Sequence, residues 1–269
     1  HPAAKYVGVV GMVIPLSVMI YYTYIESWTA GFALFSLTKD YWGHTTQEGM
    51  VGYLRSFQGI RAEGAPVYHG SWTPYLFYAG TLGINIWVLS RGISGGIEKL
   101  AKIGMPILFF FAVILMGVVL FTPEQVGIGT SPISDGLAFL YTPDLSKLGS
   151  AGVWLAAAGQ IFFTLSVGMG SLQAYASYLS TKDDIALNGL ATAATNETVE
   201  VILGGSIAIP AAVTFFGVSG AMAIANGGSY DLGFATMPVV FQQIDKTLPI
   251  GSLLGFMWFG LLFFAGITS

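Results

Sequence analysis

Hydroxyl and glycine residues gather within one apolar segment that is long enough to cross a bilayer. Thr164 and Ser166 carry the hydroxyls, and Gly168 and Gly170 follow them. Each glycine costs a helix interior about 1 kcal/mol relative to alanine. In lipid, an interrupted helix also leaves backbone N–H and C=O groups unsatisfied, at several kcal/mol each. The pattern therefore predicts a discontinuous transmembrane helix whose unwound centre is a binding site. A glycine-hinged packing kink is the alternative.

The two ends of such a break offer complementary chemistry. The first half-helix would end on free carbonyls, which suit a cation, and the second would begin with free N–H groups, which suit an anion. Phe163 and Ser166 are three residues apart and share a face just before the glycines. There, Phe163 could cap a pocket and Ser166 could bond a substrate. A zwitterion together with Na⁺ fits this pair of ends.

A second polar face lies in the first apolar segment, where Val18, Tyr22 and Glu26 follow one another at intervals of four residues. A tyrosine hydroxyl at this depth could donate to an anionic ligand. It could equally bond a carbonyl of a neighbouring helix. Glu26 lies near the outer end of the segment and could sit in a wet vestibule.

Two more faces carry oxygen atoms of the kind that hard cations prefer. Asn196 and Glu200 are four residues apart, and a carboxylate inside a membrane segment is functional by default. A buried Glu200 that stays protonated is the alternative. Ala265, Thr268 and Ser269 also share one face, and their oxygens form a plausible Na⁺ site. Serine and threonine hydroxyls can instead serve only to join helices.

The composition shows what must position these residues. The 269-residue chain is 54% hydrophobic and only 9% charged, with a mean hydropathy of +0.70, whereas a soluble domain has about 25% charged residues. We therefore expect an all-α polytopic membrane protein forming a single transmembrane domain. The first residue is not methionine and the last apolar run is incomplete, so we expect a fragment of a longer protein. Outer segments are expected at 38–71 and 217–248, and spans at about 7–35, 72–90, 103–122, 152–179, 185–216 and 249–269.

The orientation follows from the short segment Arg91–Lys102, which holds three basic residues and one acid. We interpret it as a cytoplasmic loop because cytoplasmic loops are enriched in Lys and Arg. The segment 228–247 is half apolar and too short to span. It is predicted to be either a hairpin dipping toward the helices or an amphipathic surface loop.

Several other chemistries are excluded. Zero cysteines exclude disulfides and thiolate metal sites, and the net charge of −4 without a basic patch argues against nucleic acid as a partner. All three histidines lie outside the expected spans, and no phosphate-binding glycine loop is present. An intramembrane hydrolase, and enzymatic activity in general, is therefore not expected.

Four stretches together resemble helices 3, 6, 7 and 8 of the neurotransmitter:sodium symporter family, closest to its bacterial leucine-transporting members. The resemblance is collinear over essentially the whole chain. It implies a twelve-helix protein with two inverted five-helix repeats and a discontinuous helix 6. This chain would supply helices 3 to 8, and helices 1–2 and 9–12 of the same protein would be partners outside it. The four stretches are Tyr21–Trp28, Gly159–Gly170, Asn196–Ser206 and Leu261–Ser269.

The resemblance also implies roles for individual residues. Tyr22 matches the tyrosine that bonds the substrate carboxylate, Val18 part of the side-chain pocket, Phe163 the aromatic lid and Ser166 a substrate contact. Two Na⁺ ions are implied. Thr164 and Asn196 match ligands of the ion that touches the substrate, whereas Ala265, Thr268 and Ser269 match ligands of the second. Ser177 and Tyr178 match residues near the cytoplasmic gate.

Two positions bear on ion and substrate choice. Glu200 stands where chloride-dependent members have serine, and Gln160 lies near that site, so the resemblance implies chloride-independent transport. Met169 stands where the leucine-transporting members have phenylalanine. Since methionine is flexible and fills irregular space, we expect a roomier pocket for a hydrophobic or aromatic amino acid.

The sequence thus predicts a Na⁺-coupled amino-acid symporter that works by alternating access. It would be a multi-pass protein of the plasma membrane, expected in a prokaryotic inner membrane. Its partners would be lipid and, as a possible homodimer, a second copy of itself. Two alternatives remain: an amino-acid receptor or scaffold that kept the fold without transporting, and an ion channel.

Overall fold

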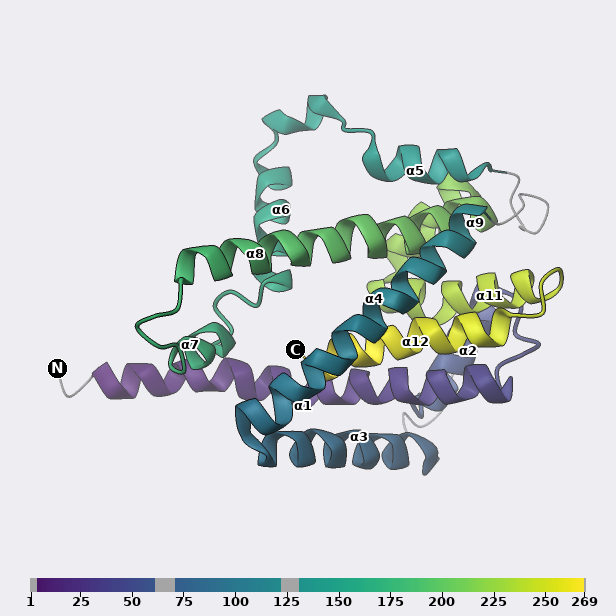
Figure 1. The fold of residues 1–269 in the computed structure, drawn as a ribbon. Helices are drawn as coiled ribbons and strands as arrows, with labels where there is room; N and C mark the ends of the chain where they lie inside the picture. The colour runs from purple at the N-terminus through teal and green to yellow at the C-terminus, as the bar shows by residue number, and fades with distance from the viewer. Residues whose placement is uncertain (1–3, 61–70, 122–130, 269) are drawn as a thin grey trace. The chain divides into compact units, whose positions relative to one another are not determined.

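The computed structural model describes residues 4–60, 71–121 and 131–268. These residues form helices, turns and irregular connections without a strand, so the expected all-α class is confirmed (Figure 1). Contacts divide the chain into two compact units. The first unit comprises His1–Tyr22 and Thr142–Ile202, and the second comprises Thr23–Tyr141 and Leu203–Ser269.

The first unit contains the beginning of the long helix α1 and a series of shorter elements. The elements are α1 (Ala4–Thr38), the 3-10 helix η3 (Leu145–Gly149), α6 (Ala151–Thr164), α7 (Ser171–Ala176), α8 (Ile185–Glu197) and most of the π-helical segment η4 (Thr198–Gly205).

Within the described residues, the second unit contains the rest of α1 and ten further elements. They are α2 (Gln47–Phe57), α3 (Thr73–Ser90), the π-helical turn η1 (Ile93–Ile97), α4 (Glu98–Phe121), α5 (Ile133–Tyr141), α9 (Ser206–Gly227), α10 (Ser229–Asp231), the π-helical turn η5 (Leu232–Thr236), α11 (Met237–Asp245) and α12 (Gly251–Ile267).

Two continuous helical stretches among the described residues are long and apolar enough to cross a membrane, Ile93–Phe121 and Ile185–Asn226. The second is interrupted by a kink at Gly217, whose φ of +72° and ψ of 167° are not helical, directly after the expected end of its span at residue 216. The division of the chain into six spans stays a prediction.

The basic segment Arg91–Lys102, interpreted as a loop, is mostly helical. The turn is confined to Arg91 and Gly92, because Gly92 has a φ of +74°, which favours glycine. Helical structure begins at Ile93, and Lys102 pairs with Glu98 one turn earlier at 2.6 Å. The charges therefore lie on the first turns of α4.

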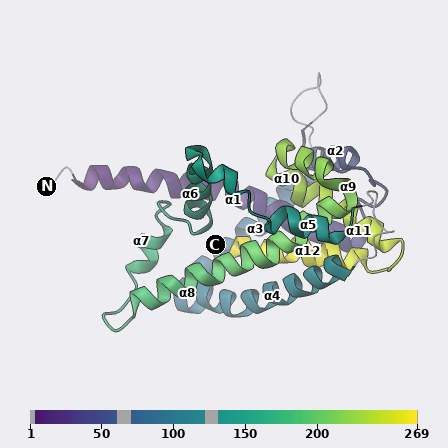
Figure 2. The ribbon, with the colours of Figure 1, turned by 90° about the horizontal axis from the view of Figure 1, so that it is seen from above.

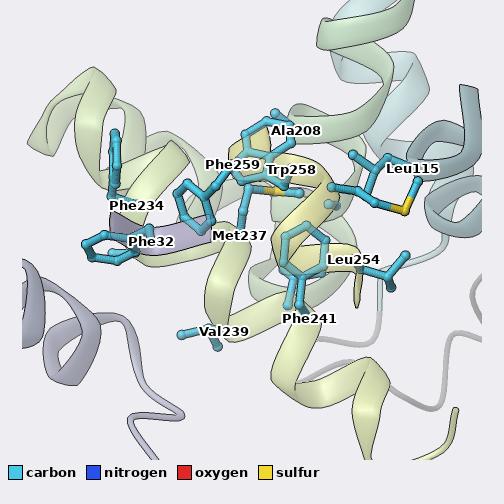
Figure 3. Packing of buried hydrophobic residues seen from close by; sticks show 14 of the residues in the cluster. Phe32, Leu115, Ala208, Phe234, Met237, Val239, Phe241, Leu254, Trp258 and Phe259 are labelled. Atoms are coloured by element: carbon cyan, nitrogen blue, oxygen red, sulfur yellow. The ribbon is translucent and has the colours of Figure 1, made fainter. Parts of the chain in front are cut away.

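The core of the second unit is aromatic, and Phe32 of α1 lies at its centre. Its fully buried ring meets Phe234 and Phe259 at centroid distances of 5.2 and 5.1 Å and stacks on Tyr41 at 5.9 Å (Figure 3). Edge-to-face and offset ring pairs contribute about 0.5–1.5 kcal/mol beyond area burial. This cluster joins α1, η5 and α12, which are far apart in sequence.

Most of the segment 228–247 is helical and its residues 234–244 are buried, so the surface-loop alternative is wrong. All residues from Met237 to Ile244 in α11 are buried, including Gln242 and Gln243. Gln242 Nε2 donates to the backbone oxygen of His44 at 3.1 Å. Composition alone left the two alternatives open, and the hydrogen bond from Gln242 to the loop before α2 shows how a polar side chain of this segment is accommodated when buried.

Small residues let helices of the second unit approach closely. A Cβ atom added to Gly136 of α5 would lie 2.5 Å from the Cα atom of Pro210 in α9. Nearby, the hydroxyls of Tyr141 and Ser206 are 2.8 Å apart. Helix α4 also packs against α12 (Figures 1 and 2).

A polar cluster centred on Asp245 ties the end of α11 to the end of α1. Its Oδ2 accepts from Lys39 Nζ at 2.9 Å and from Trp42 Nε1 at 3.3 Å, while Oδ1 accepts from the Gly251 N–H at 2.8 Å. Burial raises the pKa of Asp245, but these donors and the positive charge of Lys39 outweigh burial. The pKa of Asp245 is therefore lowered.

This lowered pKa predicts a stability difference that depends on pH. Because the folded pKa lies below the unfolded value of about 3.9, the stabilisation is fully present above that value and is lost as pH falls through the folded pKa. We expect Asp245→Asn to lower the free energy of unfolding by about 1–2 kcal/mol at neutral pH. Thermal unfolding of the full-length protein in detergent checks this, with exposed Asp135→Asn as control. A difference from wild type that persisted undiminished in strong acid would contradict it.

Candidate functional site

The interruption predicted from the glycines is present between α6 and α7 (Figure 1). Helix α6 ends at Thr164 and α7 begins at Ser171. Between them, Ser166, Gly168 and Gly170 have φ values of +54°, +83° and +89°. Such left-handed conformations suit glycine, and a serine adopts them only under strain. The backbone of these residues cannot continue α6.

The end of α6 folds back on itself before the chain turns away. The Val167 N–H bonds the Phe162 carbonyl at 2.8 Å, and the Ser166 N–H bonds the Phe163 carbonyl at 3.1 Å. Such tightened bonds satisfy carbonyls that a helix end otherwise leaves open. The last side chain of the helix, Thr164, is half-buried.

Four side chains meet at this end of α6. Thr164 Oγ1 donates to Glu200 Oε2 and accepts from Asn196 Nδ2 at 2.8 Å. Gln160 Nε2, one turn earlier on α6, donates to Glu200 Oε1 at 2.7 Å. Asn196 Nδ2 also lies 3.4 Å from Glu200 Oε2. The structure therefore joins the end of α6 to α8 and η4 through one polar cluster, hereafter the Glu200 cluster.

The Glu200 cluster has a distinctive electrostatic arrangement. Its only carboxylate accepts hydrogen bonds from three uncharged side chains of the first unit, and no Lys or Arg of the described residues pairs with it. The carboxylate thus supplies a negative charge next to the hydroxyl of Thr164 and the amide of Asn196. Uncharged oxygens beside a carboxylate are the ligands that a hard cation prefers. That these residues bind Na⁺ stays a prediction.

The expected substrate residues lie in two places. Phe163, exposed, precedes the break, and the half-buried Ser166 and Met169 lie within it. Val18 and Tyr22 are half-buried and occupy one face of α1. Their assignment to a common pocket stays a prediction.

The residues expected for a second Na⁺ belong to the second unit. Ala265 lies in the last turn of α12 and Thr268 directly follows this helix. The Thr268 hydroxyl donates to the Phe264 carbonyl at 2.6 Å, so it is engaged by its own helix. Ser269 lies outside the described residues. The other expected pair, Ser177 and Tyr178, follows α7, where the Ser177 hydroxyl bonds the Ala174 carbonyl at 2.6 Å.

One polar contact was not found from the sequence. Asn85 of α3 donates from Nδ2 to Glu26 Oε2 at 2.8 Å. Glu26 is only 5% exposed, so its expected position in a wet vestibule is wrong. A lone asparagine in an apolar helix was the available signal. It did not identify the partner, because the two residues are 59 positions apart.

Comparison with known proteins gives a consistent result. The sequence model described as the Sodium:neurotransmitter symporter family matches residues 69–269. An uncharacterised sodium-dependent transporter of Methanocaldococcus jannaschii is 29% identical over 277 aligned residues, which cover 100% of this chain and 52% of that protein. The sodium-dependent neutral amino acid transporter B(0)AT1 of Mus musculus is 23% identical, covering 73% of this chain and 32% of that protein.

The fold is also similar to that in a crystal structure of MhsT in complex with L-phenylalanine. The TM-score is 0.74 at 29% sequence identity, and the match covers 98% of this chain and 53% of MhsT. The chain spans about half the length of the curated relatives that match nearly all of it.

The turn after α6 predicts that a Cβ atom at Gly168 is costly. A left-handed conformation costs an L-residue about 1–2 kcal/mol, so Gly168→Ala should lower the free energy of unfolding by that amount. Gly159→Ala is the matched control, because Gly159 lies inside α6 with open space around it. Thermal unfolding of the full-length protein measures both. Equal effects of the two substitutions would contradict the assigned backbone.

Proposed function

The chain belongs to the Sodium:neurotransmitter symporter family, and from this premise we propose that it is part of a transporter that moves an amino acid together with Na⁺. The family and the fold are those of multi-pass membrane transporters rather than enzymes. The observation that carries the proposal is the interrupted α6, whose last residue joins the Glu200 cluster. A helix break in an apolar segment is stable only where it is buried in protein or lines a cavity.

One Na⁺ is proposed to bind at the Glu200 cluster. The Thr164 hydroxyl and the Asn196 amide oxygen would be its ligands, together with the carboxylate of the bound substrate. This role for Thr164 is supported by its position as the last residue of α6 and by its hydrogen bonds to Asn196 and Glu200. Electrostatic attraction from the carboxylate of Glu200 would favour a cation there.

A second Na⁺ is proposed at the end of α12. The Ala265 carbonyl and the hydroxyls of Thr268 and Ser269 would be the ligands contributed by this chain. Helix C-termini carry partial negative charge, which favours a cation. The remaining ligands of both ions, and further substrate contacts, would come from helices 1–2 and 9–12 of the same protein.

The proposed substrate is a hydrophobic or aromatic amino acid. Tyr22 would bond its carboxylate, Val18 and Met169 would contact its side chain, and Phe163 would cover it while Ser166 contacts it from the break. The flexible Met169 supports a large side chain. The relative MhsT was crystallised with L-phenylalanine, which agrees with this class.

Transport would proceed by alternating access. Binding of Na⁺ and substrate would stabilise a closed state, and the region around Ser177 and Tyr178 would open toward the cytoplasm. We place the protein in the plasma membrane, in contact with lipid, as a prokaryotic inner-membrane protein that could form a homodimer.

The first test measures amino-acid binding in sodium and in choline buffer. We expect binding of L-phenylalanine by the full-length protein to require Na⁺. Thr164→Val keeps the shape but removes the hydroxyl, so the sodium concentration for half-maximal binding should rise roughly tenfold, equivalent to about 1.4 kcal/mol. Thr198→Val is the control, because that exposed hydroxyl bonds only the Ala194 carbonyl of its own helix. Identical binding in the two buffers would refute the proposal.

The second test concerns chloride. We propose that Glu200 supplies the negative charge that an anion would otherwise provide. In Glu200→Ser, the side chains of Gln160, Thr164 and Asn196 would lose their anionic acceptor and could donate to chloride instead.

Uptake by wild-type full-length protein in proteoliposomes should therefore be the same with chloride or gluconate. Uptake by Glu200→Ser should fall severalfold in gluconate and recover in chloride, since a charge-assisted hydrogen bond contributes about 1.5–3 kcal/mol. The neighbouring Glu197→Ser, in which the Glu200 cluster is intact, should stay independent of chloride. If chloride does not affect Glu200→Ser, the role given to Glu200 is wrong.

A further inference from the structure

Glu26 of α1 is a buried carboxyl group that the proposed sodium and substrate sites do not use. Its side chain is 5% exposed. Asn85 Nδ2 donates to its Oε2 at 2.8 Å, whereas its Oε1 is buried and has no hydrogen-bond partner among the described residues. A buried polar atom without a partner is rare and calls for an explanation.

The surroundings of Glu26 are uncharged. A Cβ atom added to Gly266 of α12 would lie 3.2 Å from Glu26 Cγ, so the carboxyl group packs directly against the end of that helix. Neither α3 nor α12 contains a charged residue. Tyr22 lies one turn before Glu26 on α1, and Tyr24 of α1 contacts Tyr78 of α3 at a ring centroid distance of 6.1 Å.

The closest charged element is the start of α4, which packs on the same end of α12, because a Cβ atom added to Gly104 of α4 would lie 3.7 Å from Thr268 Cγ2. Helix α4, which packs along α12, carries Glu98, Lys99 and Lys102 in its exposed first turns, where Lys102 already pairs with Glu98. On α1 itself, the other charged residue is Lys5, 21 positions away from Glu26. Even so, no Lys or Arg among the described residues forms an ion pair with Glu26.

An ionised Glu26 would be unstable in this place. Removing a carboxylate from water is costly even after relaxation, and one hydrogen bond from a neutral amide does not offset that cost. A neutral carboxylic acid avoids most of the cost and still accepts the Asn85 hydrogen bond at Oε2. Its proton then resides on Oε1, the atom that lacks a partner.

We propose that Glu26 is a proton-binding site of the transporter, protonated on Oε1 while α1, α3 and α12 are packed as here. When the contact with Gly266 opens and water enters, the O–H bond at Oε1 breaks and the proton passes to water. The electron pair stays on the carboxylate, whose Oε2 keeps the hydrogen bond from Asn85. Because α12 also carries Ala265 and Thr268, a change at this helix end would link proton release to sodium binding. That linkage rests on the proposed function, whereas the protonation does not.

Infrared spectroscopy of the full-length protein tests the protonation directly. A protonated carboxyl group has a carbonyl band that a carboxylate lacks. We expect wild-type protein at neutral pH to show such a band, and Glu26→Gln to lose it. The control Glu48→Gln, which removes an exposed acid from α2, should retain it. Absence of the band from wild-type protein, or an unchanged band in Glu26→Gln, would overturn the proposal. Absence of the band from wild-type protein overturns the proposal even if Glu26→Gln fails to fold.

Proton flux tests the functional consequence. In proteoliposomes loaded with a pH-sensitive dye, sodium-driven uptake by wild-type protein should move protons in the opposite direction. Glu26→Gln should keep sodium-dependent binding of L-phenylalanine while its proton flux falls to background. A flux equal to that of wild type would overturn the proposed release step. If wild-type protein shows no sodium-dependent uptake at all, the proposed function fails, and the infrared band still decides whether Glu26 holds a proton.

Discussion

A helix that stops inside an apolar segment must find other partners for its terminal groups, and this constraint governs the structure around α6. The turn after Thr164 satisfies some carbonyls through the N–H groups of Ser166 and Val167. The side chain of Thr164 then connects the helix end to Asn196 and Glu200. The interruption and the Glu200 cluster therefore depend on each other. Without the cluster the break would lack its attachment, and without the break Thr164 would be an ordinary residue in a helix interior.

The second unit must also provide hydrogen-bond partners for its buried polar groups, and it does so in a different way. Its helices approach closely at glycines, and its buried hydroxyls mostly bond within it. At Gly255, for example, an added Cβ atom would lie 2.7 Å from Ser36 Oγ and 2.8 Å from the Tyr41 hydroxyl, which bond each other. Burial raises the pKa of Tyr41, so this hydroxyl stays protonated and available as a donor. Glu26 differs, because one of its oxygens has no partner among the described residues.

The turn after α6 and the aromatic core differ in how easily their backbone can change conformation. The turn at Ser166–Gly170 has glycines at left-handed positions and few buried side chains. The aromatic core around Phe32 and α11 is fully buried and unites elements distant in the sequence. A transporter needs both properties, since a rigid part must support a part that changes its conformation. In this chain, the turn at Ser166–Gly170 has the features of the part that changes conformation, and the core around Phe32 and α11 has those of the rigid part.

The sequence alone determined the helical class, the break after Thr164 and the pairing of Asn196 with Glu200 along one helix. These features depend on local composition and on residues four apart, which a single helix brings together. The tertiary structure decided the contacts between distant residues. It placed Gln160 and Thr164 against Glu200, buried Gln242 and Gln243 inside the protein, and brought Asn85 to Glu26. Periodicity cannot specify these contacts, because the packing of whole helices determines which buried polar group meets which.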